Sequence, residues 1–305
     1  MDQFERTRIL IGDEALDRLR AARVAVFGVG GVGGYAVEAL ARSGIGALDL
    51  IDNDTVCLTN LNRQIMATHS TVGKYKVDVA TERIMDINPD CAVRTYKTFF
   101  LPETEGEFDF TEYDYIVDAI DTVAAKISLV LNAQRVGTPI ICALGTGNKL
   151  DPGKLELGDL YDTSVCPLAR VMRRELRRRG VMHLQVLWSR EEPIRPLPSE
   201  EETTRRSVPG STAFVPPAAG LMIASEVVRQ LGRQGIRKGS APPLALSDAS
   251  GHETEEDTAK PPHDVCQLRD VVRAGEARHD LGAEVERHHQ NHRQRDSAAL
   301  HVGER

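Results

Sequence analysis

A glycine-rich stretch near the start of the chain has the residue types and spacing that bind a nucleotide. The sequence GVGGVG over 28–33 fits the pattern G-x-G-x-x-G, after an apolar run over 24–27 and before a helical pattern over 32–43. The first glycine permits a tight turn, the second lets the backbone approach phosphate, and the third allows close helix–strand packing. The following helix N-terminus favours an anion. The glycines concerned are Gly28, Gly30, Gly31 and Gly33.

An acid and a polar loop after the next apolar run indicate which nucleotide is bound. Asp52 ends that run, where a carboxylate can accept hydrogen bonds from ribose hydroxyls. A dehydrogenase needs only this acid, but here several polar residues crowd the next turn. An arginine and a lysine near a phosphate loop can neutralise the β- and γ-phosphates and the leaving pyrophosphate. Together the residues favour a triphosphate over a solvated polar loop; they are Asp54, Asn60, Asn62, Arg63, Gln64 and Lys76.

A second acidic position follows the apolar run over 113–120. Asp121 lies just past this run, where open α/β sheets present their ligands. A carboxylate there can hold Mg²⁺ and so position phosphates. The alternative is that Asp121 caps the helix that begins at Thr122, and the two roles are compatible.

The elements that must position these residues alternate between strands and helices. Apolar runs predict strands over 24–27, 47–52, 91–97, 113–120 and 139–144, and helical spacing predicts helices over 32–43, 74–87 and 122–136. This alternation favours an α/β fold with a parallel sheet and right-handed crossovers. After residue 151 the pattern changes to a basic helix over 167–179, a strand over 183–188 and a small-residue helix over 217–231.

Composition sets limits on the class of protein. The 305 residues are 41% hydrophobic and 27% charged, with a net charge of −7. No apolar run approaches the roughly 18 residues of a membrane span, and the charged N-terminus lacks a signal-peptide core, so a cytoplasmic location is expected. The five cysteines form no CxxC pair, which argues against a zinc site. Any nucleic-acid partner must meet a local basic patch.

The last part of the chain differs from the rest. No Phe, Trp or Tyr follows Phe214, and seven of the nine histidines lie at position 252 or later. Such a segment buries too little apolar surface to offset its ordering entropy. We therefore expect a domain over 1–235, with 151–235 as its substrate side, and a disordered tail over 236–305.

Five segments resemble one family. GVGGVGG, LIDNDTVCLTNLNRQ, VGKYKVDVA, INP and YIVDAIDTVAAK resemble the adenylating enzymes of the ubiquitin-activating superfamily, the ThiF/MoeB/HesA group, over roughly residues 3 to 232. The resemblance implies a Rossmann-like E1 adenylation fold, mostly parallel with flanking helices, that uses ATP and Mg²⁺. It implies that Arg63, Lys76 and Asp121 contact ATP or its magnesium, and that Asp118 supports them. Arg6 resembles an arginine that the family delivers across a dimer interface, so a homodimer is expected.

Three branches of this superfamily are distinguishable. The large ubiquitin activators add a catalytic cysteine domain, for which this chain is too short, and the sulfur-carrier activators commonly carry two CxxC pairs. TSVCPLARVMRRELRRRG, VLWSREEPIRP and STAFVPPAAGLM instead resemble the tRNA threonylcarbamoyladenosine dehydratases, the TcdA/CsdL group. Many relatives have Asp-Pro where this chain has Cys166-Pro167, which puts a role for an acid there in doubt. A nucleophilic role for Cys166 is not required by a dehydration.

The resemblance implies a reaction and a partner. ATP activates the threonyl carboxylate of N6-threonylcarbamoyladenosine at tRNA position 37 as an acyl adenylate, and a carbamoyl atom then closes a ring. The basic helix fits a tRNA partner, because arginines contact phosphates; a solvated helix face is the alternative. The arginines proposed for tRNA are Arg170, Arg173, Arg174, Arg177 and Arg178. The competing hypotheses are a sulfur-carrier activator, an NAD-binding oxidoreductase and a catalytically silent scaffold.

Overall fold

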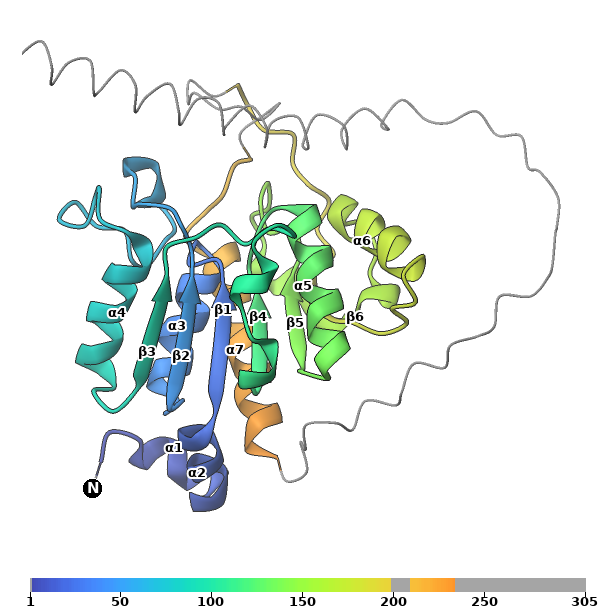
Figure 1. Ribbon diagram of the computed structural model, residues 1–305. Helices are drawn as coiled ribbons and strands as arrows, with labels where there is room; N and C mark the ends of the chain where they lie inside the picture. Colours follow the sequence, from blue (N-terminus) through green and yellow to red (C-terminus); the bar gives the residue numbers. More distant parts are fainter. Residues whose placement is uncertain (1, 199–208, 234–305) are drawn as a thin grey trace, which may run out of the picture. The chain divides into compact units, whose positions relative to one another are not determined.

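The computed structural model describes residues 2–198 and 209–233, all of which belong to one compact unit. Within them is a seven-stranded sheet of order β3-β2-β1-β4-β5-β7-β6 (Figure 1). Every neighbouring pair of strands is parallel except β6 and β7. The strands are β1 (Arg23–Phe27), β2 (Ala47–Ile51), β3 (Ala92–Tyr96), β4 (Tyr115–Asp118), β5 (Ile140–Ala143), β6 (Leu155–Asp159) and β7 (Gln185–Ser189).

Helices cover both faces of this sheet. One core cluster joins α3, α4 and α7 to β1 and β2, through residues such as Val37, Val77 and Ile223. The opposite face packs on α5 and on a group of aromatic rings around Phe27. The described helices are α1 (Glu5–Ile11), α2 (Asp13–Ala21), α3 (Gly33–Arg42), α4 (Lys76–Ile87), α5 (Val123–Val136), α6 (Pro167–Arg177) and α7 (Val215–Gly232).

The predicted α/β fold with a mostly parallel sheet is confirmed. The predicted strands and helices occur within a few residues of their expected bounds. Three elements were not expected from the sequence, namely α1, α2 and the antiparallel strand β6. β6 was missed because Leu155 is its only fully buried residue, so it lacks the apolar run of a central strand. The predicted tail over 236–305 lies outside the described residues.

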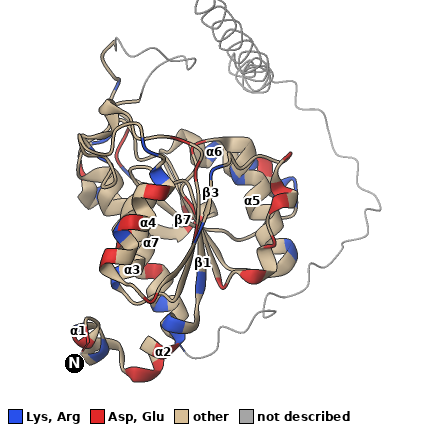
Figure 2. Cartoon of the chain, turned by 60° about the vertical axis from the view of Figure 1, so that its left-hand side comes forward, with Lys and Arg blue, Asp and Glu red and all other residues tan. Residues whose placement is uncertain are grey.

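Parallel strands bring the predicted polar segments to one edge of the sheet. The glycine loop follows β1, the polar loop follows β2, and the turn that holds Asp121 follows β4, so all three lie at the carboxyl edge (Figure 1). Helices α1 and α2 lie at the opposite, amino edge. Charged residues occur mainly on helices and loops, as Figure 2 shows. Ligands of open α/β sheets bind at the carboxyl edge.

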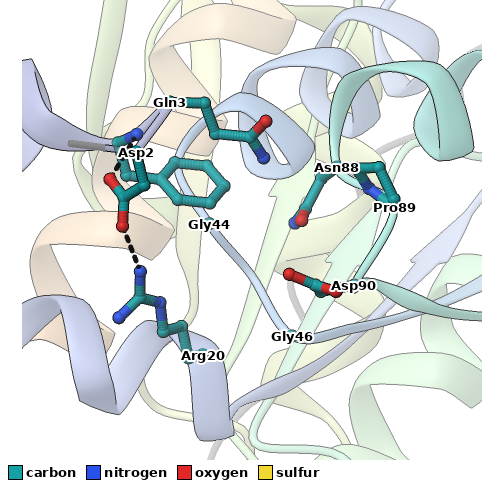
Figure 3. A pocket seen from close by; sticks show the side chains of 9 residues that line it. Asp2, Gln3, Arg20, Gly44, Gly46, Asn88, Pro89 and Asp90 are labelled. Carbon is teal, nitrogen blue, oxygen red and sulfur yellow. Dashed lines mark hydrogen bonds and ion pairs between the residues drawn. The ribbon is translucent and has the colours of Figure 1, made fainter.

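A cavity of about 470 Å³ opens at the amino edge instead (Figure 3). Asp2 and Arg20, which form an ion pair of 2.9 Å, line it from one side, and Asn88 lines it from the other. None of the glycine-loop or polar-loop residues contributes to it. No helix within 2–198 or 209–233 combines the length and apolar character that crossing a bilayer requires.

Candidate nucleotide site

The glycine loop makes a tight turn whose shape depends on two of its glycines. Gly28 has φ of +91°, a conformation that L side chains rarely adopt. A Cβ on Gly33 would lie 1.8 Å from the Gly28 carbonyl oxygen, so only glycine fits there. At Gly30, by contrast, the nearest protein atom would be 3.9 Å away. A Cβ at Gly30 would therefore clash with nothing, so the backbone there is less crowded than at Gly28 and Gly33, as a phosphate-binding backbone requires.

The arginine and glutamine of the polar loop lie against this turn. A Cβ on Gly31 would be 3.6 Å from the Arg63 side chain, and one on Gly30 would be 3.9 Å from Gln64 Nε2. The Arg63 guanidinium is held by the Thr59 carbonyl at 3.0 Å and by the Asn62 side chain. Gln64 is buried, and its Oε1 has no hydrogen-bond partner among the described residues. The arrangement thus places one cation and one orphaned polar atom beside the loop.

Lys76 lies between two carboxylates at the end of β2. Its ammonium is 2.7 Å from Asp54 Oδ2 and 3.8 Å from Asp52 Oδ1, and only 6% of its side chain is exposed. Asp52 Oδ2 accepts the Val29 N–H at 2.7 Å, so this acid also fixes the glycine loop. Burial raises the pKa of Asp52, and the Lys76 charge opposes that rise. Asp54 is exposed, so an incoming phosphate can compete with it for Lys76.

The two asparagines of the polar loop hold the protein backbone. Asn60 Oδ1 accepts the Cys57 N–H at 3.3 Å and closes the turn before Arg63. Asn62 donates to the Ser211 carbonyl at 2.9 Å while its oxygen accepts from Arg63 at 2.8 Å. Asn62 thereby links Arg63 to the segment that leads into α7.

The two acids at the end of β4 differ in exposure. Asp121 is exposed in the turn before α5, and Thr122 Oγ1 lies 3.4 Å from its carboxylate. Thr122, not Asp121, is the N-cap of that helix. Asp118 is fully buried and forms an ion pair of 3.0 Å with Lys126. Of the two, only Asp121 is accessible from the surface, and Asp118 lies beneath it.

The donor set fits magnesium held by a nucleotide. The described residues contain no group of three or more His, Cys, Asp or Glu side chains that would hold a metal alone. Mg²⁺ usually binds one or two carboxylates together with substrate phosphates. Asp121 has an exposed carboxylate at the carboxyl edge, which is the type of group that such a metal binds. This arrangement suits a metal that arrives with a triphosphate.

Arg6 lies away from the other predicted site residues. It is exposed on α1, at the amino edge, whereas the polar loop is at the carboxyl edge (Figure 1). On the same helix Ile9 and Leu10 are 74% and 86% exposed. Arg6 therefore cannot join the nucleotide site of its own chain, and a role there requires a second copy.

The basic helix α6 has one apolar face and one basic face. Its apolar face packs in a core cluster with residues of β5 and β7, through the buried side chains of Ala169, Met172 and Leu176. Arg173 is half-buried and donates to the Thr163 carbonyl at 2.9 Å, so it ties the helix to the preceding loop. Arg177 lies over the Tyr161 ring, with 4.8 Å from its guanidinium carbon to the ring centroid. Arg170, Arg174, Arg177 and Arg178 are exposed.

Two features beside the site were not singled out from the sequence. The first is Lys126, which lies on the buried face of α5. A lysine at an otherwise apolar position of a helix is the sequence signal that indicates it. Asn148 has φ of +59° and holds Gly210 by two hydrogen bonds of 2.7 Å. No spacing rule connects residues 148 and 210, so this contact had no sequence signal.

Comparison with known proteins agrees with this geometry. The tRNA threonylcarbamoyladenosine dehydratase of Bacillus subtilis is 42% identical over 241 residues, which are 76% of this chain and 95% of that protein. The Escherichia coli dehydratase is 42% identical over 175 residues, 57% of this chain and 65% of that protein. The solved structure of Escherichia coli TcdA in complex with ATP superposes with a TM-score of 0.69 at 34% identity, covering 76% and 96% of the two chains.

A family assignment follows from the sequence match together with the fold. The ThiF family matches residues 4–268, most of the chain. The match includes the glycine loop, the polar loop and the turn after β4, which the structure brings to one edge of the sheet. This chain belongs to the ThiF family.

Proposed function

We propose that the protein is an ATP-dependent tRNA threonylcarbamoyladenosine dehydratase. The observation that carries this proposal is the convergence of Arg63, Gln64 and Lys76 with the glycine loop at the carboxyl edge. It is supported by similarity to the Bacillus subtilis dehydratase over 95% of that protein's length. A tRNA substrate makes the cytoplasm the expected location.

The reaction has two steps. An oxygen of the threonyl carboxylate attacks the α-phosphorus of ATP, and pyrophosphate leaves. An atom of the neighbouring carbamoyl group then attacks the activated carbon, loses its proton and closes a five-membered ring as AMP leaves with the carboxylate oxygen. The net change in the base is loss of water. Ring closure is intramolecular, so a high effective concentration of the nucleophile favours it.

Each predicted site residue has a task in the first step. The glycine-loop N–H groups bind phosphate, and Arg63 neutralises charge that develops at the α-phosphorus. Lys76 supplies a second positive charge once phosphate displaces Asp54 from it. Mg²⁺, when bound, neutralises the pyrophosphate leaving group, and Asp121 is the residue proposed to hold it. Gln64, whose Nε2 lies beside the glycine loop, is proposed to contact the nucleotide through that amide N–H.

Mass spectrometry of tRNA nucleosides tests this function. Purified protein, ATP and tRNA that carries threonylcarbamoyladenosine are expected to give the cyclised base, a loss of one water, and Asp121→Ala protein is not. Pyrophosphate exchange that requires a small diglycine-ending protein, with no effect of tRNA, would instead identify a sulfur-carrier activator. Tight binding of NAD with no binding of ATP would identify an oxidoreductase.

Arg6 is proposed to complete the site of a second subunit in a homodimer. The exposed Ile9 and Leu10 beside it supply an apolar surface for such an interface. Mixing Arg6→Ala with Arg63→Ala protein is expected to restore about a quarter of wild-type activity, because half of the dimers are mixed and each has one complete site. Each variant alone is expected to be nearly inactive. Failure of the mixture, in conditions where subunits exchange, would contradict the shared site.

The exposed face of α6 is proposed to bind tRNA phosphates. Arg170→Ala combined with Arg178→Ala is expected to weaken tRNA binding and to reduce the slope of log K against log salt by about 1.5, since each phosphate contact contributes about 0.7–0.9. Filter binding across a salt series measures this slope. Arg94→Ala combined with Arg135→Ala, two exposed arginines on β3 and α5, is the matched control. An unchanged slope in the α6 variant would remove this helix from the interface.

A further inference from the structure

A fully buried ion pair lies directly beneath the turn that carries Asp121. Asp118 is the last residue of β4, and Lys126 lies in the first turn of α5. Both side chains are 0% exposed, and Lys126 Nζ is 3.0 Å from Asp118 Oδ1. Removing two charges from water is costly, and a well-packed apolar pair at such a position is often as stable or more stable. Stability therefore does not explain why this position holds a lysine.

Lys126 also holds the end of the next strand. Its ammonium donates to the Ala143 carbonyl at 2.7 Å, at the last residue of β5. β4 and β5 are neighbours in the sheet, with Asp118 opposite Cys142. One ammonium therefore joins α5, β4 and β5 at the carboxyl edge, where an apolar side chain would make none of these bonds.

The turn that Lys126 fixes is in contact with the glycine loop. Asp118 Oδ1, which accepts from Lys126, also accepts the Ile120 N–H at 3.1 Å. The Ala119 N–H donates to the Phe27 carbonyl at 2.8 Å, and a Cβ on Gly28 would lie 2.7 Å from the Ala119 oxygen. A shift of this turn must consequently move both the glycine loop and Asp121.

We propose that Lys126 is a positioning residue for adenylation, which sets the turn over 118–121 so that Asp121 and the glycine loop face the same triphosphate. This inference rests on the proposed function, because it assumes that ATP binds at this edge. Lys126 itself is buried and touches no ligand. Its effect is expected on the β- and γ-phosphates and their magnesium, and not on the AMP part of the nucleotide.

The test compares this ion pair with a second one, which has a fully buried carboxylate but a partly exposed arginine. Lys126→Met leaves Asp118 without a countercharge and can fail to fold, so it is paired with Asp118→Asn, whose side-chain oxygen still accepts from Ile120. The matched control is Arg23→Met with Asp49→Asn. That pair, at 2.5 Å, joins β1 and β2 and has a fully buried carboxylate, but Arg23 begins β1 at the amino edge.

Five quantities are measured on both double variants: the Tm, the Kd for AMP, the Kd for ATP with Mg²⁺, the Mg²⁺ concentration for half-maximal ATP binding, and the single-turnover rate of AMP formation. For the Lys126 variant we expect AMP binding near that of wild type, ATP binding about tenfold weaker and a rate about 100-fold lower, as for a misplaced reacting group. The Mg²⁺ concentration needed for half-maximal ATP binding is expected to rise. The Arg23 double variant is expected to have a lower Tm but unchanged nucleotide binding and an unchanged rate.

Two outcomes overturn the proposal. Lys126 and Arg23 variants that behave alike, or a Lys126 variant that loses AMP and ATP binding equally, would show a purely structural pair. Asp121→Ala distinguishes this result from failure of the proposed function. If the Asp121→Ala variant adenylates normally, the proposed nucleotide site is wrong. If it is inactive while the Lys126 double variant forms AMP at the normal rate, the nucleotide site stands and only the positioning role of Lys126 is contradicted.

Discussion

Arg63→Ala protein is expected to form AMP about 10³-fold more slowly than wild type in single-turnover reactions. The Arg63 side chain lies against the glycine loop, 3.6 Å from where a Gly31 Cβ would be. We propose that its guanidinium supplies positive charge where the α-phosphorus gains negative charge. Loss of one such donor typically costs about 10²–10³ in rate. Rapid-quench measurement of labelled AMP at saturating ATP and tRNA gives the rate.

Two further variants serve as controls for the Arg63→Ala rate, one at the same position and one at a remote arginine. Arg63→Lys keeps the charge but loses the planar fork, so an intermediate rate is expected. Arg94→Ala removes an arginine that pairs with Glu112 at 2.6 Å on the outer strand β3 and is expected to leave the rate unchanged. A full rate for Arg63→Ala would exclude Arg63 from the chemistry and leave it as a structural residue of the polar loop.

Gly33→Ala is expected to lower the free energy of unfolding by about 3 kcal/mol or more, which corresponds to a fall of roughly 10 °C in Tm. Alanine normally stabilises a helix relative to glycine. Here its methyl group would lie 1.8 Å from the Gly28 carbonyl oxygen, which belongs to the backbone and has no flexible atom to displace. The turn before α3 must therefore open. Thermal and urea unfolding measure the loss.

Gly30→Ala is the matched substitution within the same loop. A methyl group there meets no protein atom closer than 3.9 Å, so the Tm is expected to change little. It would occupy the space in which a phosphate approaches the backbone, so ATP binding is expected to weaken about tenfold. Equal losses of stability in the two variants would show that a methyl group does not fit at Gly30, and unchanged ATP binding by Gly30→Ala protein would show that Gly30 is not at a phosphate site.

Local sequence was sufficient to predict the elements that carry the site. The strand before Gly28 and the helix after it can each be predicted from a short stretch of sequence. Burial of one face of such an element sets the spacing of its apolar residues. The same holds for α4 after the polar loop and for α5 after Asp121. β6 was not predictable in this way, since an antiparallel edge strand has few buried positions and its pairing with β7 joins distant segments.

Roles of individual polar side chains were less predictable. From the sequence, Arg173 is indistinguishable from the other arginines of α6. In the structure its guanidinium donates a hydrogen bond to the Thr163 carbonyl. Asn62 is predicted from the sequence to contact the nucleotide. The structure adds that its amide nitrogen donates to the Ser211 carbonyl and its amide oxygen accepts from Arg63. Each of these contacts depends on how a loop folds back, which is set by packing and not by the spacing of neighbouring residues.

The sequence by itself predicted a nucleotide as the class of ligand, because glycines at fixed spacing, an acid after the second strand and the Asn-x-Asn-Arg-Gln run each have a local chemical meaning. Only the tertiary structure decided which side chains meet. It brought Arg63 to Gly31, buried Lys126 against Asp118, and placed Arg6 at the far edge of its own sheet. The physical reason is that hydrogen bonds and ion pairs act over a few ångströms, whereas the residues that form this site extend from Gly28 to Asp121 in the sequence.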